Sequence, residues 1–533
     1  MDMLDHVWLG VLAVISGPSL FEILGVGIPV TLVMVAGGFL TGVLVGATPG
    51  LAGPMAMAVS LPILISVFGF ETEALLPVMG FLIGVMKGAT IGGAVPAILF
   101  NTPGTPDAVF TTMDGHPMTR AGRSGKALKV AHFASVSGDT VSDIVLFVCA
   151  PFLAVLVERY LDLPEKTALI LFSLAFIAAV VGDSVAKGLL AMGLGMFAAF
   201  VGTGEDFYPR LTGDVPWLAQ GFSVTSAVLG VLIVGEIFRR LEDMMRERAE
   251  RGRISQTPPS GDSGLPWSER RRLFPFIANS AAIGTLIGAL PGIGSTLAAT
   301  IGYASGRKMH ARREAIGPAF GKGAPEGIAA TEAANSAVSG ANLIPVLSLG
   351  IPGNAAAVFL ILATESIGGF NPGPAVFRVP SDGINSEMVL AFGIFTAMTF
   401  ANVLNWLIGG RIMRAMSIMI RVPKQVLLPS VLLVTLTAIY VQETSMTALV
   451  ITLGFGVLGY LFRRLEISVL PFVIAFILAG SLESTARQAF SATGGDPWFL
   501  VSSPLSMIFI VAALVIMVVI GRTRDRRVSS EGD

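Results

Sequence analysis

Hydrophobic residues in this chain form long runs rather than short alternating patterns. Each run of about 20 residues is long enough to cross the roughly 30 Å hydrocarbon core of a membrane as a helix. The runs occupy residues 28–45, 140–157, 166–181, 220–237, 388–408, 426–441, 446–462 and 504–521. Further apolar segments are interrupted by glycine and proline. The pattern predicts an all-α polytopic membrane protein with about 10 to 12 transmembrane helices.

Glycine and proline interrupt the apolar segments in the same order at two places. Each copy has a first Pro-Gly, a Gly-rich element ending in proline, and a second Pro-Gly seven positions after that proline. The first copy comprises Gly46–Gly53, Gly92–Pro96 and Asn101–Gly104, and the second comprises Gly288–Ser295, Gly340–Pro345 and Gly350–Asn354. Paired interruptions of this kind indicate a transporter binding site near the middle of the membrane.

The most polar interior stretch, residues 239–272, separates the two copies. Its centre is rich in Pro, Ser and Gly and predicts a flexible linker. We therefore expect a first membrane repeat over 1–238, a polar cytoplasmic linker over 239–272, a second membrane repeat over 273–524 and a cytoplasmic tail over 525–533. The linker and the tail are both basic, and short basic segments tend to remain in the cytoplasm.

Charges around the two copies have opposite signs. Between its interruptions the first copy has Glu71 and Glu73 and no Lys or Arg over 51–86, whereas the equivalent stretch of the second copy is basic from Arg307 to Lys322. After the second Pro-Gly the bias reverses. Because basic loops favour the cytoplasmic side, we predict two inverted-topology repeats containing Gly/Pro-broken helices. The alternative is chance recurrence, since Gly and Pro are frequent in membrane helices.

The interruptions are the candidate substrate site. A helix that restarts after a break directs its N-terminal N–H groups, with about half a positive charge, toward the break, which favours an anionic substrate. The candidate residues are Pro49, Gly50, Thr102, Pro103, Gly104, Thr105, Pro291, Gly292, Gly294, Ser295, Pro352, Gly353 and Asn354, together with Lys87. The alternative is that the glycines only permit close helix packing, which does not explain the prolines.

Ionisable residues inside apolar segments are candidates for ion coupling. Asp139 and Asp143 are one helical turn apart and share a face, where they could hold a cation or relay a proton or lie at a wet helix end. Glu332 and Asn335 form a second polar face beside the second set of breaks. Lys87 is expected to be buried and to need a partner, either a bound anion or a neighbouring carboxylate.

Composition narrows the function further. Hydrophobic residues make up 53% of the 533 residues and charged residues 13%, far from the roughly 25% charged residues of a soluble domain. The net charge of −1 argues against a nucleic-acid partner, and the single cysteine, Cys149, excludes an intramolecular disulfide. No complete phosphate loop and no His-x-x-x-His pair occurs. We therefore predict no catalytic residues, no cofactor and no metal beyond a possible Na⁺.

Taken together, these motifs resemble the large membrane subunit of tripartite tricarboxylate transporters, the TctA family. The matching stretches span most of residues 40–360. They are Gly42–Gly50, Pro103-Gly104 with Thr111–Met118 and Gly122–Leu128, Gly288–Ser295, Phe320–Gly327 with Glu332–Asn335, and Ile344–Asn354. Beyond residue 390 only the general pattern of hydrophobic spans is similar.

The resemblance implies a multi-pass protein of the bacterial inner membrane that takes up organic di- or tricarboxylates. Its expected partners are a small membrane subunit and a periplasmic solute-binding protein, and the expected driving force is a Na⁺ or H⁺ gradient. Thr105 stands where the family often has an acidic residue, and Lys87 where the position is usually neutral, so citrate is not assured as the substrate. A channel, an intramembrane enzyme acting on lipid-soluble substrates, or a scaffold subunit whose partner transports remain the alternatives.

Overall fold

In the residues that it describes, the computed structural model has helices as its main elements and two short hairpins, β1 (Ser19–Ile23) with β2 (Val26–Pro29) and β3 (Gly202–Thr203) with β4 (Pro209–Arg210). It describes residues 2–23, 25–48, 51–103, 105–182, 184–203, 208–213, 215–247, 264–312, 317–380, 383–419 and 424–531. Among these residues, 8 helices are long and apolar enough to cross a membrane, and five shorter apolar helices accompany them. The prediction of an all-α polytopic membrane protein is confirmed.

The chain forms two compact units, and each contains segments from both sides of the polar linker. Unit 1 comprises Met1–Val155, Gly252–Leu290 and Gly294–Leu427, and unit 2 comprises Leu156–Arg251, Pro291–Ile293 and Leu428–Asp533. The predicted repeats, 1–238 and 273–524, are therefore not the same divisions as the compact units. Their boundaries remain predictions.

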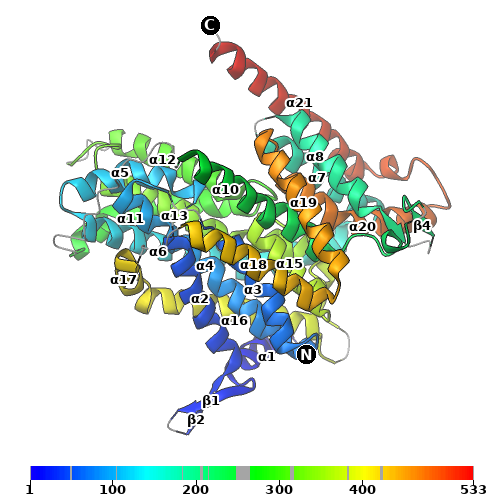
Figure 1. Ribbon diagram of the computed structural model, residues 1–533, viewed down its shortest axis with the longest axis horizontal. Helices are drawn as coiled ribbons and strands as arrows, with labels where there is room; N and C mark the ends of the chain where they lie inside the picture. The colour runs from blue at the N-terminus through cyan, green and yellow to red at the C-terminus, as the bar shows by residue number, and fades with distance from the viewer. Residues whose placement is uncertain are drawn as a thin grey trace. The chain divides into compact units, whose positions relative to one another are not determined.

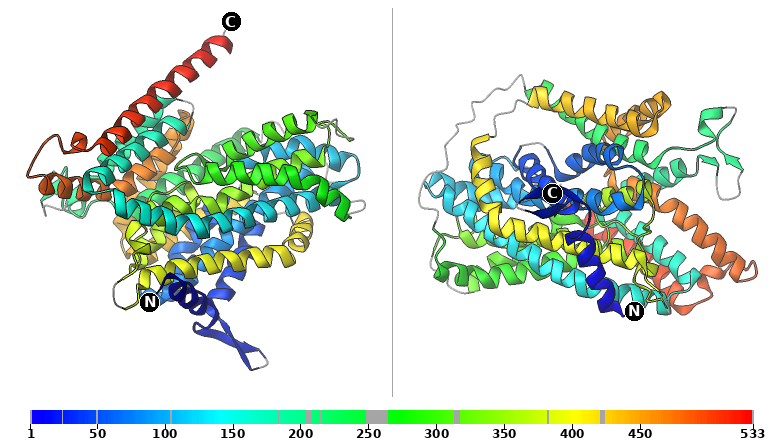
Figure 2. Two further views of the ribbon diagram at one scale, coloured as in Figure 1. Left: turned by 180° about the vertical axis from the view of Figure 1, so that it is seen from behind. Right: turned by 90° about the horizontal axis from the view of Figure 1, so that it is seen from below.

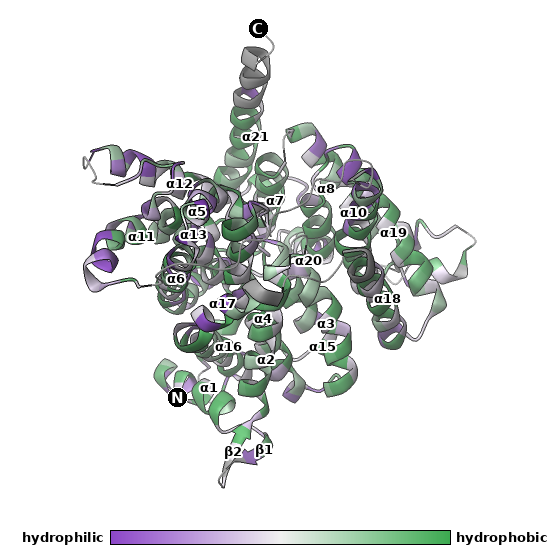
Figure 3. Cartoon of the chain, turned by 60° about the vertical axis from the view of Figure 1, so that its left-hand side comes forward, coloured by the Kyte–Doolittle hydropathy of each residue, from purple (hydrophilic) through white to green (hydrophobic). Residues whose placement is uncertain are grey.

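Unit 1 contains both copies of the Gly/Pro signature apart from Pro291–Ile293. Its helices are α1 (Met3–Ile15), α2 (Val30–Ala47), α3 (Gly53–Phe68), α4 (Leu75–Phe100), α5 (Val109–Arg120), most of α6 (Ser124–Tyr160), α11 (Trp267–Gly288), α12 (Gly294–Arg312), α13 (Pro325–Ala341), α14 (Leu343–Leu349), α15 (Ala355–Ile367), α16 (Ser386–Leu404) and α17 (Gly410–Met419). The β1–β2 hairpin projects from this unit between α1 and α2 (Figure 2). Hydrophobic residues predominate along α2, α4 and α16, and hydrophilic ones are frequent on α11 and α12 (Figure 3).

Glycines bring α2 and α4 into close contact, side by side (Figure 1). At each of these glycines a Cβ atom would meet the backbone of the other helix, and on each helix they are spaced four residues apart. They are Gly38, Gly42 and Gly46 of α2, and Gly84, Gly88 and Gly92 of α4. In the second copy, Gly284 and Gly288 of α11 approach α13 in the same way. Small residues at this spacing let membrane helices approach closely, so the packing interpretation holds for these glycines.

Both copies form the same succession of elements in unit 1. A long helix ends at the first interruption (α2, α11), a second helix follows it (α3, α12), then a third (α4, α13 with α14), and another begins after the second interruption (α5, α15). The third helix ends in the left-handed region in both, at Asn101 (φ 54°) and Gly350 (φ 72°). The next backbone N–H donates to the carbonyl of Pro96 or Pro345, at 3.3 and 3.2 Å. The two prolines thus support equivalent turns.

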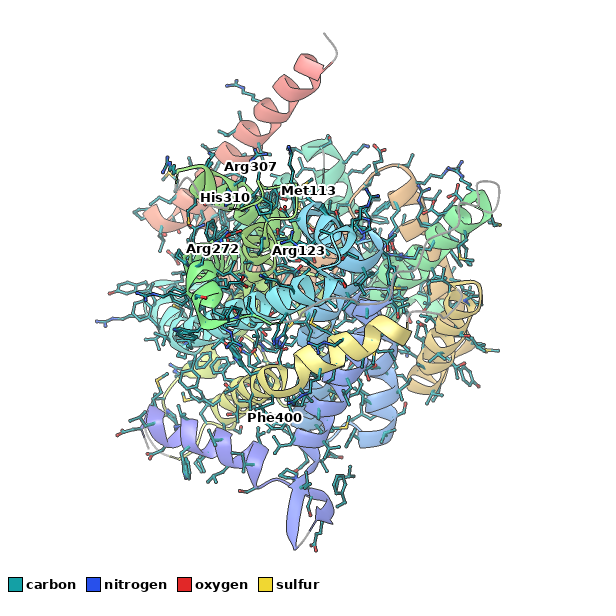
Figure 4. The ribbon with its side chains drawn as sticks, turned by 90° about the vertical axis from the view of Figure 1, so that its left-hand side faces the viewer. Met113, Arg123, Arg272, Arg307, His310 and Phe400 are labelled. Atoms are coloured by element: carbon teal, nitrogen blue, oxygen red, sulfur yellow. The ribbon has the colours of Figure 1, made fainter. Side chains whose placement is uncertain are left out.

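Basic segments of the two copies lie on the same side of unit 1. Figure 4 shows Arg123, from the first copy, near Arg307 and His310, from the second, with Arg272 of α11 beside them. Phe400 of α16 lies away from this group. Opposite insertion of the two copies requires this arrangement. Arg123 follows the second interruption of the first copy, whereas Arg307 precedes the second interruption of the second copy. The inverted relationship remains a prediction that this placement supports.

Unit 2 packs α7 (Leu163–Val180) and α8 (Val185–Ala199) against α20 (Leu470–Ala492), and α21 (Pro504–Glu531) against α7. Its other helices are α9 (Val224–Leu229), α10 (Gly235–Glu247), α18 (Lys424–Glu443, from Leu428) and α19 (Met446–Arg464). A π-helical turn at Gly230–Val234 separates α9 from α10. Arg463 donates to the carbonyls of Val231 and Leu232 at 2.8 and 2.9 Å, and so stabilises this turn.

Candidate functional site

A cavity of about 210 Å³ in unit 1 lies where the chain restarts after its interruptions. Its lining includes the first residues of α3, α12 and α15 and the turn that precedes α5. The middle of α4 and the C-terminal half of α13, with the residue that follows it, complete the wall. The first turns of helices expose N–H groups that have no partner within the helix. Helix starts that converge on one cavity therefore form a site suited to an anion.

The cavity is lined by equivalent positions of the two copies. Thr90 of α4 corresponds to Ser339 of α13, and Thr105 after the second interruption corresponds to Asn354. Each pair is separated by the same number of residues, and so are Met86 and Asn335, and Ala89 and Val338. The two copies thus contribute matching walls. Polar groups occur on both sides.

The cavity offers hydroxyl and amide groups. Its lining contains one carboxylate, Asp107, which accepts a hydrogen bond from Thr296 Oγ1 at 2.5 Å. Among the described residues that line it, none is Lys or Arg. The hydroxyl and amide side chains are Thr90, Thr105, Ser295, Thr296, Asn335, Ser339, Asn342 and Asn354. An anion bound here would be held by neutral donors and helix starts.

Asn342 contributes a buried side-chain amide that lacks a protein partner. Pro345 lacks the N–H that would bond to the carbonyl of Ala341, and α13 ends at Ala341. Asn342 therefore lies at the junction between α13 and α14. Asn342 is only 1% exposed, and neither its Oδ1 nor its Nδ2 has a hydrogen-bond partner within the described protein. An unsatisfied buried polar group costs roughly 1–3 kcal/mol. A polar ligand in the cavity would offset this cost.

Asn354 caps the helix that begins at the second interruption of the second copy. Its Oδ1 accepts from the backbone N–H of Ala357 at 2.9 Å, as in an ordinary helix N-cap. Because that oxygen is engaged, the amide NH₂ is the group that Asn354 can direct into the cavity. The polar residue predicted to follow this break is thus Asn354, with its amide NH₂ as the donor.

A buried ion-pair network lies behind the wall formed by α4 and α13. Lys87 Nζ contacts Asp139 Oδ1 and Asp143 Oδ2, each at 2.8 Å, and the lysine and Asp139 side chains are 0% and 4% exposed. Ser339, which lines the cavity, donates to Asp139 Oδ1 at 2.6 Å, and Asn402 Nδ2 donates to Asp143 at 2.6 Å. Of the two partners expected for Lys87, the structure supplies the neighbouring carboxylates. Lys87 does not line the cavity.

Glu332 has a different environment on the same helix, α13. Its side chain is buried and accepts hydrogen bonds from the hydroxyl groups of Thr111 and Ser135, the latter at 3.1 Å. No ion pair joins Glu332 to a basic residue within the described chain. Asn335, one turn further along α13, lines the cavity. Glu332 therefore lies one helical turn from the proposed substrate site.

The remaining predicted site residues are distributed unevenly. Thr105, Gly294, Ser295, Asn354 and Asn335 line the cavity. Thr102, Pro103, Pro352 and Gly353 lie in the turns that lead to it but not in its lining. Pro291 and Gly292 belong to unit 2, where Gly292 (φ 80°) packs against Ile177. Pro49, Gly50 and Gly104 fall outside the described residues.

Several lining residues were not predicted from the sequence. Thr90, Asp107, Ser339 and Asn342 belong to this group. Aligning the two copies by their prolines would have paired Thr90 with Ser339 at a common face. Asn342 lies within the quoted element Gly340–Pro345, but it was considered only as part of a break. Asp107 has no polar counterpart in the second copy, where Ala356 occupies the equivalent position.

Two of the motifs that support the family resemblance meet at Asp114 of α5. Its Oδ1 accepts from the backbone N–H groups of Gly321, Gly323 and Ala324 at 2.8–3.0 Å, and its Oδ2 accepts from the hydroxyl of Tyr303 at 3.0 Å. Burial raises the pKa of Asp114, although the hydrogen bonds oppose this shift. The contact fixes the loop before α13 against α5. It therefore positions α13, which carries the cavity wall.

Comparisons with known proteins identify relatives of this chain. The model of the "Tripartite tricarboxylate transporter TctA family" matches residues 32–474. The chain is 30% identical over 504 residues to the "Uncharacterized 52.8 kDa protein in TAR-I ttuC' 3'region" of Agrobacterium vitis, covering 94% of this chain and 95% of the relative. It is 29% identical over 247 residues to the "Uncharacterized protein in TAR-II ttuC' 3'region" of the same organism, covering 46% of this chain and 97% of the relative. No solved structure matches it significantly.

Proposed function

Because this chain belongs to the tripartite tricarboxylate transporter TctA family, we propose that it carries a small organic carboxylate across the bacterial inner membrane. In this proposal it is the large membrane subunit of a binding-protein-dependent secondary transporter. The observation that supports it most strongly is the buried amide of Asn342, which lacks a protein partner and lines a cavity of helix starts. Its partners would be a small membrane subunit and a periplasmic solute-binding protein.

The composition of the cavity supports coupling between the substrate and a cation. Asp107 is the carboxylate in the lining, and it would repel an anionic substrate. Two unit charges about 5 Å apart interact with roughly 3 kcal/mol at an effective dielectric constant of 20. A proton or Na⁺ that neutralises the site would remove this repulsion. Entry of the carboxylate would then depend on entry of the cation, as ion symport requires.

The candidate coupling groups differ in how they are neutralised. The carboxylates of Asp139 and Asp143 share the ammonium of Lys87, whereas Glu332 is held by hydroxyl groups. Glu332 and Asn335 are therefore the stronger candidates for a Na⁺ or H⁺ site beside the cavity. A channel and an intramembrane enzyme are the competing functions. A channel predicts flux without ion coupling, and an enzyme predicts chemical conversion of the substrate.

The test is uptake by cells that express the chain together with the subunits encoded beside it. A panel of di- and tricarboxylates would be supplied with and without Na⁺, at several external pH values. We expect depletion of one acid only when all components and the ion gradient are present. Depletion without a gradient would favour a channel, and conversion of the acid without accumulation would favour an enzyme.

A matched pair of helix caps tests the cavity itself. Asn354→Ala removes the N-cap of α15 and a donor that lines the cavity. Asn385→Ala removes the N-cap of α16, and Asn385 does not line the cavity. Each loses about 1 kcal/mol of helix capping. We expect the KM for the substrate to rise about tenfold in Asn354→Ala and to stay within twofold in Asn385→Ala. Equal KM values would contradict the assignment of the cavity as the substrate site.

A further inference from the structure

A second cavity in unit 1 forms an apolar groove between α6 and α16. It has a volume of about 300 Å³, and Phe147, Val148, Phe395 and Met398 are among its lining residues. Both walls belong to candidate membrane spans, Ser124–Tyr160 and Ser386–Met416. Val148 is 64% exposed, as expected of a residue that faces hydrocarbon. The groove is thus a seam between two spans.

A third cavity, of about 440 Å³, is basic and lies further along the same helices. Its lining includes Lys129 of α6, Arg270 of α11, and Arg411 and Arg414 of α17. Among its described lining residues there is no Asp or Glu. Arg270 lies over the ring of Phe133, 5.5 Å from its centroid, and donates to the carbonyl of Leu265 at 3.2 Å. Three arginines and one lysine therefore line one cavity.

Trp406 joins the apolar groove to the basic cavity, because its side chain lines both. It lies in the π-helical turn Asn405–Gly409, which His132 fixes by a 2.9 Å hydrogen bond to the carbonyl of Asn405. The Trp406 Nε1 donates to Thr140 Oγ1 at 3.1 Å. Trp406 therefore marks the boundary between the apolar groove and the basic cavity.

The two cavities together extend along slightly more of α6 than the thickness of one leaflet, so a lipid with its phosphate in the basic cavity would reach the nearer part of the groove. From Lys129 to Val148 the axis of α6 rises by about 28 Å, at 1.5 Å per residue. One leaflet of a bilayer, with its headgroup layer, is about 20–22 Å thick. The basic cavity would lie at the headgroup level and the groove along the acyl chains. The order of residues is the same along α6 and along α16 with α17. On each wall the basic residues line one end, and the apolar residues of the groove line the other.

We propose that these two cavities bind one anionic phospholipid of the membrane. The phosphate lies among Arg270, Arg411 and Arg414, and one acyl chain lies in the groove between α6 and α16. Clusters of basic residues between membrane helices bind anionic headgroups through this charge complementarity. The linker that contains Arg270 is predicted to be cytoplasmic, and the cytoplasmic leaflet is the anionic one. The site is separate from the substrate cavity and does not depend on the proposed transport.

The bound acyl chain would also cover part of the ion-pair network. Asp143 and Asn402 line the inner side of the groove, and the side chain of Asp143 is 10% exposed. An acyl chain in the groove excludes water from this side of Asp143. The lipid would thereby strengthen the interaction of Asp143 with Lys87, because charges attract more strongly in a medium of lower dielectric constant.

The test uses the purified full chain, stripped of lipid in detergent, and native mass spectrometry with defined probes. These are dioleoyl phosphatidylglycerol, dioleoyl phosphatidylcholine and inorganic phosphate. We expect one phosphatidylglycerol to bind about tenfold more tightly than phosphatidylcholine. Each basic residue near an anionic headgroup contributes about fivefold in affinity, so Arg411→Gln with Arg414→Gln should weaken phosphatidylglycerol binding about 25-fold.

The control pair is Arg307→Gln with Lys308→Gln, which removes two exposed positive charges of α12 that do not line the basic cavity. It should leave phosphatidylglycerol affinity unchanged within twofold. A separate variant, Val403→Trp, fills the apolar groove without a change of charge and should also weaken the lipid. Equal affinity for the two lipids, or equal loss in both charge variants, would overturn the proposal. Displacement of the lipid by millimolar phosphate would instead indicate a site for free anions.

Discussion

Two buried acidic clusters in unit 1 lie near the same cavity wall but are neutralised differently. Asp139 and Asp143 share the ammonium of Lys87, at 2.8 Å from each. Glu332 accepts hydrogen bonds from two hydroxyl groups and forms no ion pair within the described chain. A buried charge without a partner is costly, whereas a buried ion pair offsets much of its desolvation. The first cluster therefore contains one cation for its two carboxylates, and the second contains none within the described chain.

This difference separates a structural role from a coupling role. One ammonium balances only one of the two carboxylates, so the Asp139–Asp143 pair keeps a net charge of −1 when both are ionised. Beside Glu332, Thr111, Ser135 and the nearby Asn335 add oxygen atoms of the kind that coordinate Na⁺. A transporter needs a group whose charge changes during its cycle. We infer that Glu332, which has no ammonium beside it, is the stronger candidate for that group and that Lys87 holds the wall of the cavity together.

The largest effect should follow removal of the built-in cation. Lys87→Met leaves two buried carboxylates without their partner, and loss of one member of a buried pair costs about 3–5 kcal/mol. We expect much lower expression in the membrane and a lower melting temperature in detergent. Combining Lys87→Met with Asp139→Asn and Asp143→Asn should restore part of the stability, because no uncompensated charge remains. An unchanged melting temperature in the single variant would refute the structural role of Lys87.

A smaller effect on stability, but a larger one on coupling, is expected at Glu332. Glu332→Gln preserves the shape of the side chain, and its carbonyl oxygen can still accept from Thr111, so the free energy of unfolding should change by about 1 kcal/mol or less. Uptake should lose its dependence on Na⁺ or on pH. Asp139→Asn serves as the comparison, since it should reduce stability and retain ion dependence. If both variants retain ion dependence, neither carboxylate couples transport to the gradient.

The sequence predicted the membrane class and the repeated interruptions because each depends on local composition. Runs of apolar residues identify spans, and proline prevents regular helix wherever it occurs. The cavity depends instead on which helix faces pack together. Ser339 and Asp107 are unremarkable within their own segments, and their importance follows from the approach of α13 to the turn before α5. Similarly, Pro291-Gly292 matches the other breaks in sequence but packs in unit 2.

Lys87 illustrates the same limit. Its burial could be predicted from the apolar residues around it, but the sequence left open whether an anion or a carboxylate would be its partner. The choice depends on α6, which brings Asp139 and Asp143 to α4. The one-turn spacing of the two aspartates was visible in the sequence, and it explains why a single ammonium reaches both.

Ser339 connects the ion-paired cluster to the cavity, and its removal should have a moderate effect. Ser339→Ala deletes the 2.6 Å hydrogen bond to the Asp139 carboxylate, with a cost of about 1.5–3 kcal/mol. Because Ser339 also lines the cavity, we expect the substrate KM to rise about fivefold. The control is Ser348→Ala, since Ser348 is buried, bonds to the carbonyl of Ile344 in its own helix and does not line the cavity. A similar rise in KM for both variants would indicate a general packing defect.

The smallest effect is expected at Thr90, the counterpart of Ser339 in the first copy. Its hydroxyl donates to the carbonyl of Met86 in its own helix, at 3.0 Å, and forms no described bond to the acidic clusters. Thr90→Val keeps the shape of the side chain, so stability should change by about 0.5 kcal/mol or less and the KM by about twofold. Uptake kinetics of Thr90→Val and Ser339→Ala measured side by side would compare the two cavity walls. A KM increase in Thr90→Val as large as that in Ser339→Ala would show that both walls contact the substrate equally. The connection to Asp139 would then contribute nothing to substrate binding.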